Sequence, residues 1–95
     1  LIVRITYDPA KNQRNVVERQ LPFELAAEFE FESALIHVDD RRDYPETRYV
    51  ALGFLQQRLH VLCFAETPDG IRVISLRKAN IREVRRYAQT QTPDR

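Results

Sequence analysis

The sequence predicts an α+β fold. In this fold a first strand and two N-terminal helices precede an antiparallel sheet of four to five strands, and one helix closes the chain. Three observations predict it. The hydrophobic period is helical up to Ser33 and changes to alternation after it. Capping residues stand where helices would begin, with Asp8 before Pro9 and Asn80 three residues before Glu83. Turn residues separate the alternating runs.

The first part of the chain holds one predicted strand and two predicted helices. Residues 2–7 are rich in β-branched and aromatic types, which favour a strand. Asp8 and Pro9 predict a helix over residues 10–19, because Asp caps free amide groups and Pro at the first helical position loses no needed hydrogen bond. Pro22 starts a second predicted helix with one apolar face.

The second part predicts the sheet and the closing helix. Residues 39–45 form a charged loop, residues 56–58 a tight hairpin, and residues 67–70 a turn in which Gly70 is expected to take a positive φ. Asn80 begins the last helix, and the polar tail from residue 89 is expected to be frayed. The predicted strands of this part cover residues 34–38, 48–55, 59–66 and 71–78.

Length and composition predict a single domain over residues 1–95. The hydrophobic fraction of 43% and the charged fraction of 31% exclude a disordered chain, and no apolar run approaches the roughly 20 residues of a membrane span. Cys63 is the single cysteine, and its apolar surroundings predict a buried hydrophobic residue rather than a nucleophile. No signal-peptide pattern opens residues 1–7, so we expect a reducing, cytoplasmic location without a membrane partner.

Charge is distributed unevenly along the chain, although the net charge is only +1. Residues 24–46 carry eight acids against two arginines, a net of −6, and residues 71–95 carry seven basic residues against two acids, a net of +5. A basic face attracts phosphate and an acidic one attracts a basic partner. Both could also be ordinary solvated faces.

Standard enzyme motifs are missing from the sequence. Two glycines are too few for a phosphate-cradling loop, and there is no nucleophile elbow. We expect no cofactor, and no metal site, because only His37 and His60 could join Cys63 and no ligand spacing recurs. What remains is a group of arginines around the strand at 71–78, next to a helix N-terminus, which is a setting suited to phosphate.

Alternation along this strand is expected to place Arg72 and Arg77 on opposite faces. RNA cleavage without metal requires a base for the 2′-hydroxyl, stabilisation of the phosphorane charge and an acid for the leaving oxygen. Arg72 and Arg77 are candidates for the second task. The candidates for the proton transfers are His60, Glu83, Tyr87 and Lys11.

Each of these candidates also has a purely structural interpretation. His60 can be a partly exposed strand residue, Glu83 a capping acid paired with Arg86, and Tyr87 a core residue. The outer arginines of the last helix can be a solvated face; they are Arg82, Arg85 and Arg86.

Three motifs in register resemble the BrnT-type toxins. The opening motif consists of Tyr7, Asp8, Pro9, Ala10, Lys11 and Asn15, followed by Leu21, Phe23 and Ala26 or Ala27. Arg48 and Gly53 supply the middle. The closing motif consists of Ile71, Arg72, Ile74, Ser75, Arg77, Lys78, Ala79, Glu83 and Tyr87. The resemblance covers nearly the whole chain.

This resemblance implies a RelE-like ribonuclease fold and the toxin of a type II toxin–antitoxin system, which inhibits translation by metal-independent RNA cleavage. It implies a BrnA-like ribbon-helix-helix antitoxin as partner, with operator DNA bound only through the antitoxin. Arg72 and Arg77 would hold the scissile phosphate, and Glu83 or Tyr87 would transfer protons or orient the arginines. The residues expected to contact RNA are Lys11, Asn15, Arg19, Arg48 and His60.

One departure from the family pattern bears on activity. Glu18-Arg19-Gln20 stands where the family usually has Lys-His-Gly, so the side chain best suited to proton transfer near neutral pH is replaced. His60 could compensate. The alternatives are a weak or inactive BrnT-like protein that acts as an antitoxin-binding module, and a small nucleic-acid-binding regulator, which the balanced charge disfavours.

Overall fold

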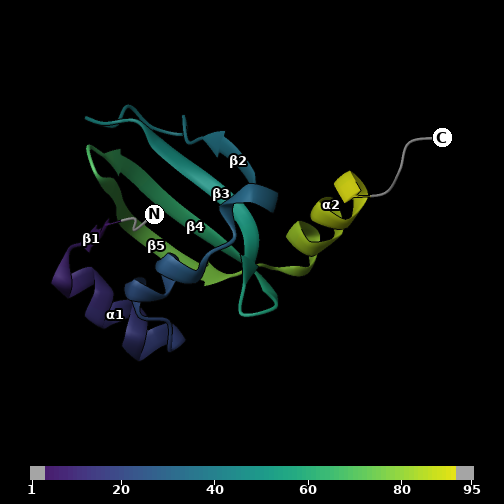
Figure 1. Cartoon of the computed structure of the whole chain (residues 1–95), viewed down its shortest axis with the longest axis horizontal. Helices are drawn as coiled ribbons and strands as arrows, with labels where there is room; N and C mark the ends of the chain where they lie inside the picture. Colours follow the sequence, from purple (N-terminus) through teal and green to yellow (C-terminus); the bar gives the residue numbers. More distant parts are fainter. Residues whose placement is uncertain (1–3, 92–95) are drawn as a thin grey trace.

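The computed structural model describes residues 4–91 and confirms the α+β class. Its five strands form one sheet in the order β1-β5-β4-β3-β2 (Figure 1). The elements are β1 Arg4–Tyr7, α1 Pro9–Arg19, the 3₁₀ helices η1 Phe23–Glu28 and η2 Phe31–Ser33, β2 Leu35–Val38, β3 Arg48–Leu55, β4 Arg58–Thr67, β5 Gly70–Lys78 and α2 Ile81–Gln91.

The sheet is mixed, so the expectation of a wholly antiparallel sheet was wrong. β2 to β5 form the predicted antiparallel meander, whereas β1 pairs with β5 in parallel, with Arg4 opposite Gly70 and Tyr7 opposite Val73. Turn residues predict only which consecutive strands pair with each other. The pairing of β1 could not be predicted in this way, because its partner β5 lies near the other end of the chain. Positions 2 and 3 of the predicted first strand lie outside the described residues.

The predicted second helix is also wrong as an α-helix, because the segment after Pro22 forms the 3₁₀ helix η1. Phe23, Ala26 and Phe29 are 1%, 0% and 5% exposed. A 3₁₀ helix has three residues per turn, so this spacing of three directs all these side chains to the core. They pack on the sheet residues of the main core, which are Ala51, Leu55, Leu62, Phe64, Ile71, Val73 and Leu76.

Both helix starts are confirmed. The Asp8 carboxylate accepts a hydrogen bond from the Ala10 amide at 2.9 Å, with Pro9 as the first helical residue. Asn80 and Glu83 form a reciprocal capping box: the Glu83 amide donates to Asn80 Oδ1 at 2.9 Å, and the Asn80 amide donates to Glu83 Oε1 at 2.8 Å. α2 is helical to Gln91, so residues 89–91 are not frayed as expected, and the rest of the predicted tail lies outside the described residues.

The predicted tight hairpin is present, whereas the turn at Gly70 differs from its predicted geometry. The hairpin between β3 and β4 turns on Gln56 and Gln57, both at positive φ, 51° and 66°, as in a two-residue type I′ turn. Gly70 has no positive φ. A Cβ at Gly70 would lie 2.0 Å from the Arg4 carbonyl oxygen, so glycine is required there because the β1 backbone approaches closely.

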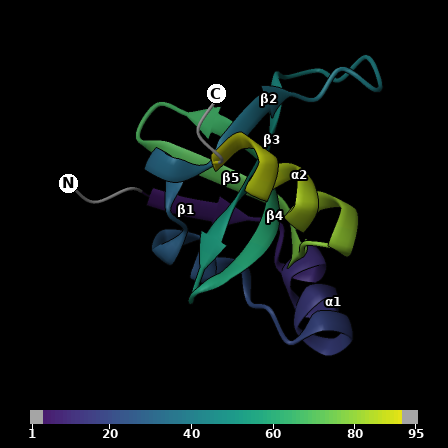
Figure 2. The same ribbon diagram turned by 90° about the vertical axis from the view of Figure 1, so that its right-hand side faces the viewer.

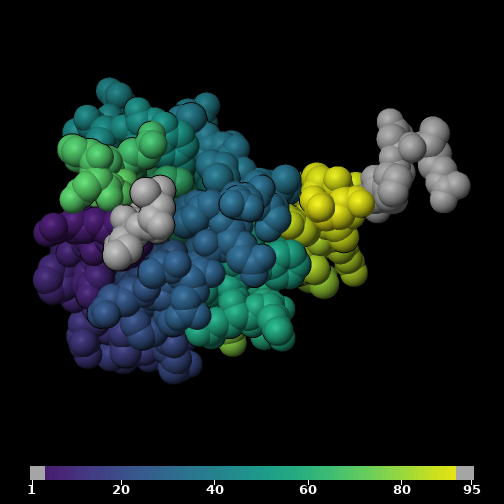
Figure 3. Space-filling model, viewed as in Figure 1, coloured from purple at the N-terminus to yellow at the C-terminus, as the bar shows by residue number. Residues whose placement is uncertain are grey.

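α2 packs through Tyr87 on the face of the sheet opposite the main core, which is the second face. The helix extends beyond the sheet, as Figures 1 and 3 show. Tyr87 anchors it: the hydroxyl donates to the Ser33 carbonyl at 2.8 Å, and the ring meets the edge of Phe54. Tyr87 forms a small second core with Leu52, Leu59 and Val61. The loop between β2 and β3 also projects from the sheet (Figure 2). Between this loop and α2 the second face holds an open pocket lined by residues of both.

Candidate functional site

A β-bulge in β5 decides where its arginines point. Cys63 pairs with Ser75 but Phe64 pairs with Val73, so Ile74 is an extra residue in β5. One extra residue reverses the alternation beyond it. Arg72 opposite Ala65 and Arg77 opposite Val61 therefore lie on the same face of the sheet. The expectation that Arg72 and Arg77 lie on opposite faces was wrong.

The open part of this face contains a pocket of about 330 Å³. Val50, Val61, Cys63 and Ser75 belong to its sheet wall. Its charged wall is formed by Arg77 from β5, by Glu83 and Arg86 from α2, and by Asp39, Asp40 and Arg41 from the β2–β3 loop. The Cys63 thiol is buried as predicted, and burial raises its pKa.

Arg77 is held by Glu83 in a bidentate ion pair. Nη1 and Nη2 of Arg77 each donate to a different Glu83 carboxylate oxygen at 2.9 Å. The hydrogen bonds from Arg77 outweigh burial and, with the Asn80 amide, lower the pKa of Glu83 to about 2. Glu83 is therefore ionised at neutral pH. It orients Arg77 across the pocket and is unsuited to donating a proton.

Glu46 binds a second pair of arginines on the same face. Its Oε1 accepts a hydrogen bond from Arg72 Nη2 at 2.5 Å and from Arg48 Nη2 at 3.4 Å. Burial alone would raise the pKa of Glu46, but the Arg72 hydrogen bond and both positive charges lower it. Arg48 also stacks over the Tyr44 ring at 4.1 Å, and its buried Nε has no hydrogen-bond partner among the described residues.

Sequence reasoning missed Glu46 and a second carboxylate, Asp39. Glu46 stands two residues before Arg48, a spacing that puts both side chains on one side of an extended chain and could have indicated the pair. The buried Asp39 carboxylate accepts two hydrogen bonds from Arg41 at 2.8 Å, which lower the pKa of Asp39. This pair fixes the start of the projecting loop.

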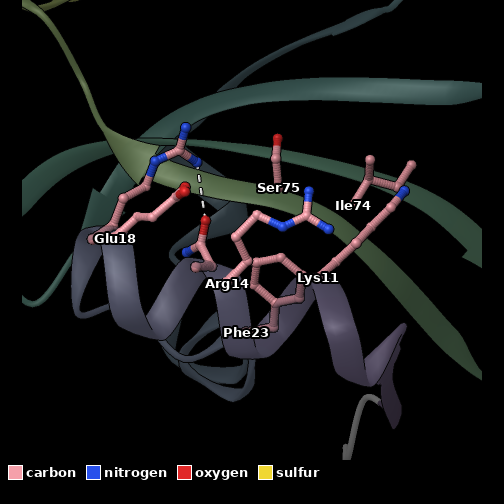
Figure 4. Close-up of a pocket in the computed structure, with 8 residues that line it drawn as sticks. Lys11, Arg14, Glu18, Phe23, Ile74 and Ser75 are labelled. Atoms are coloured by element: carbon pink, nitrogen blue, oxygen red, sulfur yellow. Dashed lines mark hydrogen bonds between the residues drawn. The ribbon is translucent and has the colours of Figure 1, made fainter.

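A second pocket, of about 240 Å³, lies between α1 and the β5 bulge. Lys11 and Arg14 extend from α1 toward Ile74 and Ser75, with Glu18 further along the helix (Figure 4). Ser75 lines both pockets, so they adjoin. Sequence reasoning selected Lys11 but not Arg14, although Arg14 is nearly one helical turn further on and shares its face.

Asn15 and Arg19 occupy the join between α1 and β5. The buried Asn15 amide donates to the Leu21 and Leu76 carbonyls at 2.8 and 3.0 Å. Arg19 Nη1 donates to Asn15 Oδ1 at 3.0 Å and to the Leu76 carbonyl at 3.4 Å. Asn15 thus holds the helix against the sheet, with 6% of its surface exposed in the second pocket, so its expected contact with RNA stays a prediction. Arg19 is exposed at the rim of the same pocket.

Two predicted site residues lie apart from the arginines. His60 is 4% exposed rather than partly exposed, its Nδ1 is 2.8 Å from the Arg58 carbonyl oxygen, and it shares the core face with Leu62. The expected contact of His60 with RNA is therefore not supported, because the sheet separates it from Arg72. Tyr87 is 6% exposed and its hydroxyl is bound to Ser33, which makes it an anchor of α2 rather than a group in the pocket.

Two properties of residues 4–91 bear on ligands and membranes. Within this range no group of three or more His, Cys, Asp or Glu side chains is placed to hold a metal ion. No helix in the same range has the length and apolar character needed to cross a membrane.

Comparisons with known proteins identify the family and support the fold. Residues 7–83 match the family model described as "Ribonuclease toxin, BrnT, of type II toxin-antitoxin system". The crystal structure of the Brucella abortus ribonuclease toxin BrnT is similar in fold, with a TM-score of 0.62 and 23% identity over 82% of this chain and 97% of that one. A search of curated protein sequences finds no significant match. Because the family model spans well over half of the sequence, the chain belongs to the BrnT family of ribonuclease toxins.

Proposed function

We propose that the chain is an endoribonuclease toxin that cleaves RNA without metal on the open face of the sheet. The observation that carries this proposal is the β5 bulge, which brings Arg72 and Arg77 to one face. Each guanidinium is fixed by a carboxylate, Arg77 by Glu83 and Arg72 by Glu46. Arg77 lines the pocket and Arg72 lies further along the same face, so a bound RNA backbone could meet both guanidinium groups. Fixed donors can stabilise charge on a phosphorane with little reorganisation.

Each charged residue of the site then has a distinct task. Arg72 and Arg77 hold the scissile phosphate, and Arg48 adds a third guanidinium beside Arg72 through their shared carboxylate, Glu46. Lys11 and Arg14 line the adjoining pocket and are suited to the phosphate of a flanking nucleotide. Glu83 orients Arg77 rather than transferring a proton, because its pKa is low. These tasks need no metal, since the guanidinium groups supply the positive charge.

We further propose a ribbon-helix-helix, BrnA-like antitoxin as partner, with operator DNA bound only through it. The family description names a type II toxin–antitoxin system, which supports an antitoxin and an RNA target. Ile81 and Val84 of α2 are 61% and 37% exposed, and a protein partner would cover such apolar side chains. Cleavage of RNA would stop translation and requires a cytoplasmic location.

The test is RNA cleavage by purified protein in EDTA. Wild type is expected to produce fragments, and Arg72→Ala and Arg77→Ala are each expected to lose roughly 10²–10³-fold in rate. Arg82→Ala removes an arginine of α2 that lines neither pocket and should keep full activity. No cleavage by wild type, together with retained antitoxin binding, would contradict the proposal and favour an inactive binding module.

A further inference from the structure

His37 is the histidine that faces the charged pocket. It lies on β2 opposite Val50, and Val50 pairs with Cys63, which pairs with Ser75. Side chains at paired positions point to the same face of a sheet. His37 therefore shares the face of the arginines, it is exposed, and it lines the 330 Å³ pocket together with Arg77.

We propose that His37 is the general acid of the reaction and protonates the leaving 5′-oxygen of the cleaved RNA. This inference rests on the proposed ribonuclease function. In the step the 2′-oxygen forms a bond to phosphorus and releases its proton to solvent. The bond between phosphorus and the 5′-oxygen breaks, and this oxygen takes a proton from the imidazolium. The products are a 2′,3′-cyclic phosphate and a 5′-hydroxyl, and His37 regains its proton from water.

The carboxylates held by arginines, the arginines themselves and the buried thiol are unsuited to that task. Asp39, Glu46 and Glu83 are bound by arginines that lower their pKa, so they hold no proton at neutral pH. Arginine does not release its proton in proteins, and the Cys63 thiol is buried in the sheet wall. Imidazole is the side-chain type that holds and releases a proton near neutral pH.

The spacing across the sheet fits a substrate between His37 and the β5 arginines. Three strand spacings separate His37 from Ser75, which is roughly 14 Å between backbones. The His37 imidazole and the β5 arginines are too far apart for a direct hydrogen bond. A phosphodiester bound between them would place its leaving group next to β2. The imidazole would thus act from strand β2, whereas Arg19, where the family pattern has a histidine, lies on helix α1.

Charged groups from three elements surround the imidazole in this pocket. The β2–β3 loop contributes Asp39, Asp40 and Arg41, and Arg77 comes from β5. α2 contributes Glu83 and Arg86, and Cys63 of β4 is the remaining titratable group. A pH profile of the cleavage rate would combine the titrations of all these groups. The test therefore varies the leaving group of the substrate instead.

The experiment compares two RNA substrates in single-turnover cleavage, an ordinary RNA and one with sulfur in place of the bridging 5′-oxygen. Sulfur leaves as a thiolate and needs no proton from an acid. His37→Gln is expected to cleave ordinary RNA roughly 10²–10⁴-fold more slowly than wild type and the sulfur substrate at nearly the wild-type rate. Arg77→Ala should be slow on both substrates, since phosphate stabilisation is required in either case.

Ile36→Gln is the matched control, because Ile36 adjoins His37 on β2, is 45% exposed and points to the other face. It should cleave both substrates like wild type. Full activity of His37→Gln on ordinary RNA, or an equal loss on both substrates, would overturn the inference while the proposed function stands. A wild type inactive on both substrates would overturn the proposed function and the inference with it. Thermal melting checks that each variant is folded.

Discussion

Replacing Glu83 by Gln tests whether the ion pair with Arg77 stabilises α2 against the sheet. The pKa of Glu83 falls from its ordinary value of 4.5 to about 2, a shift worth at most about 3 kcal/mol. The Arg77 side chain is 39% exposed, so solvent screening reduces the expected contribution to about 1 kcal/mol. Gln keeps the shape and an oxygen that can accept from the Asn80 amide, but it loses the charge.

The sign of the pH dependence follows from the lowered pKa. Because Glu83 binds its proton less readily in the folded chain, its stabilisation is fully present above pH 4.5 and is lost as the pH falls toward about 2. Urea unfolding of wild type and Glu83→Gln over this range measures the difference in the free energy of unfolding. We expect a difference of about 1 kcal/mol at neutral pH that shrinks toward zero in acid. A difference that stays constant with pH would refute the ion-pair account and leave only a capping effect.

Three further changes have defined outcomes. Gly70→Ala should lower the free energy of unfolding by about 1–3 kcal/mol in urea titrations, because its Cβ would lie 2.0 Å from the Arg4 carbonyl oxygen. Tyr87→Phe removes the hydrogen bond to Ser33, worth about 0.5–1.5 kcal/mol, and should speed amide hydrogen exchange in α2 while the sheet exchanges as before. Glu46→Gln frees two guanidinium groups, so RNA binding should depend more steeply on salt while cleavage slows; an unchanged salt slope and rate would count against the role of Glu46.

Local signals in the sequence were sufficient for most elements of the fold. Asp8 with Pro9 and Asn80 with Glu83 mark helix starts through hydrogen bonds between near neighbours, and the structure contains both caps. Alternating patterns located the four strands of the meander to within one or two residues. The parallel pairing of β1 depends on contacts between opposite ends of the chain, which no short pattern encodes.

The candidate site was predicted in part. Sequence reasoning selected Arg72, Arg77 and Arg48, and the structure places all three on one face of the sheet. The alternating pattern of β5 did not indicate the bulge at Ile74, because an apolar residue at this position also fits a regular strand. His60 was preferred to His37 on sequence grounds. The two histidines point to opposite faces of the sheet, and only the pairing of β2 with β3 shows which one meets the arginines.

The most direct test of the account is a double-mutant cycle on Arg72 and Arg77 in metal-free RNA cleavage. If the bulge brings both guanidinium groups to one phosphate, the loss in the double variant should be smaller than the product of the two single losses, with a coupling of about 0.5–3 kcal/mol. Rates that multiply independently, or full activity in either single variant, would contradict a shared site on one face of the sheet.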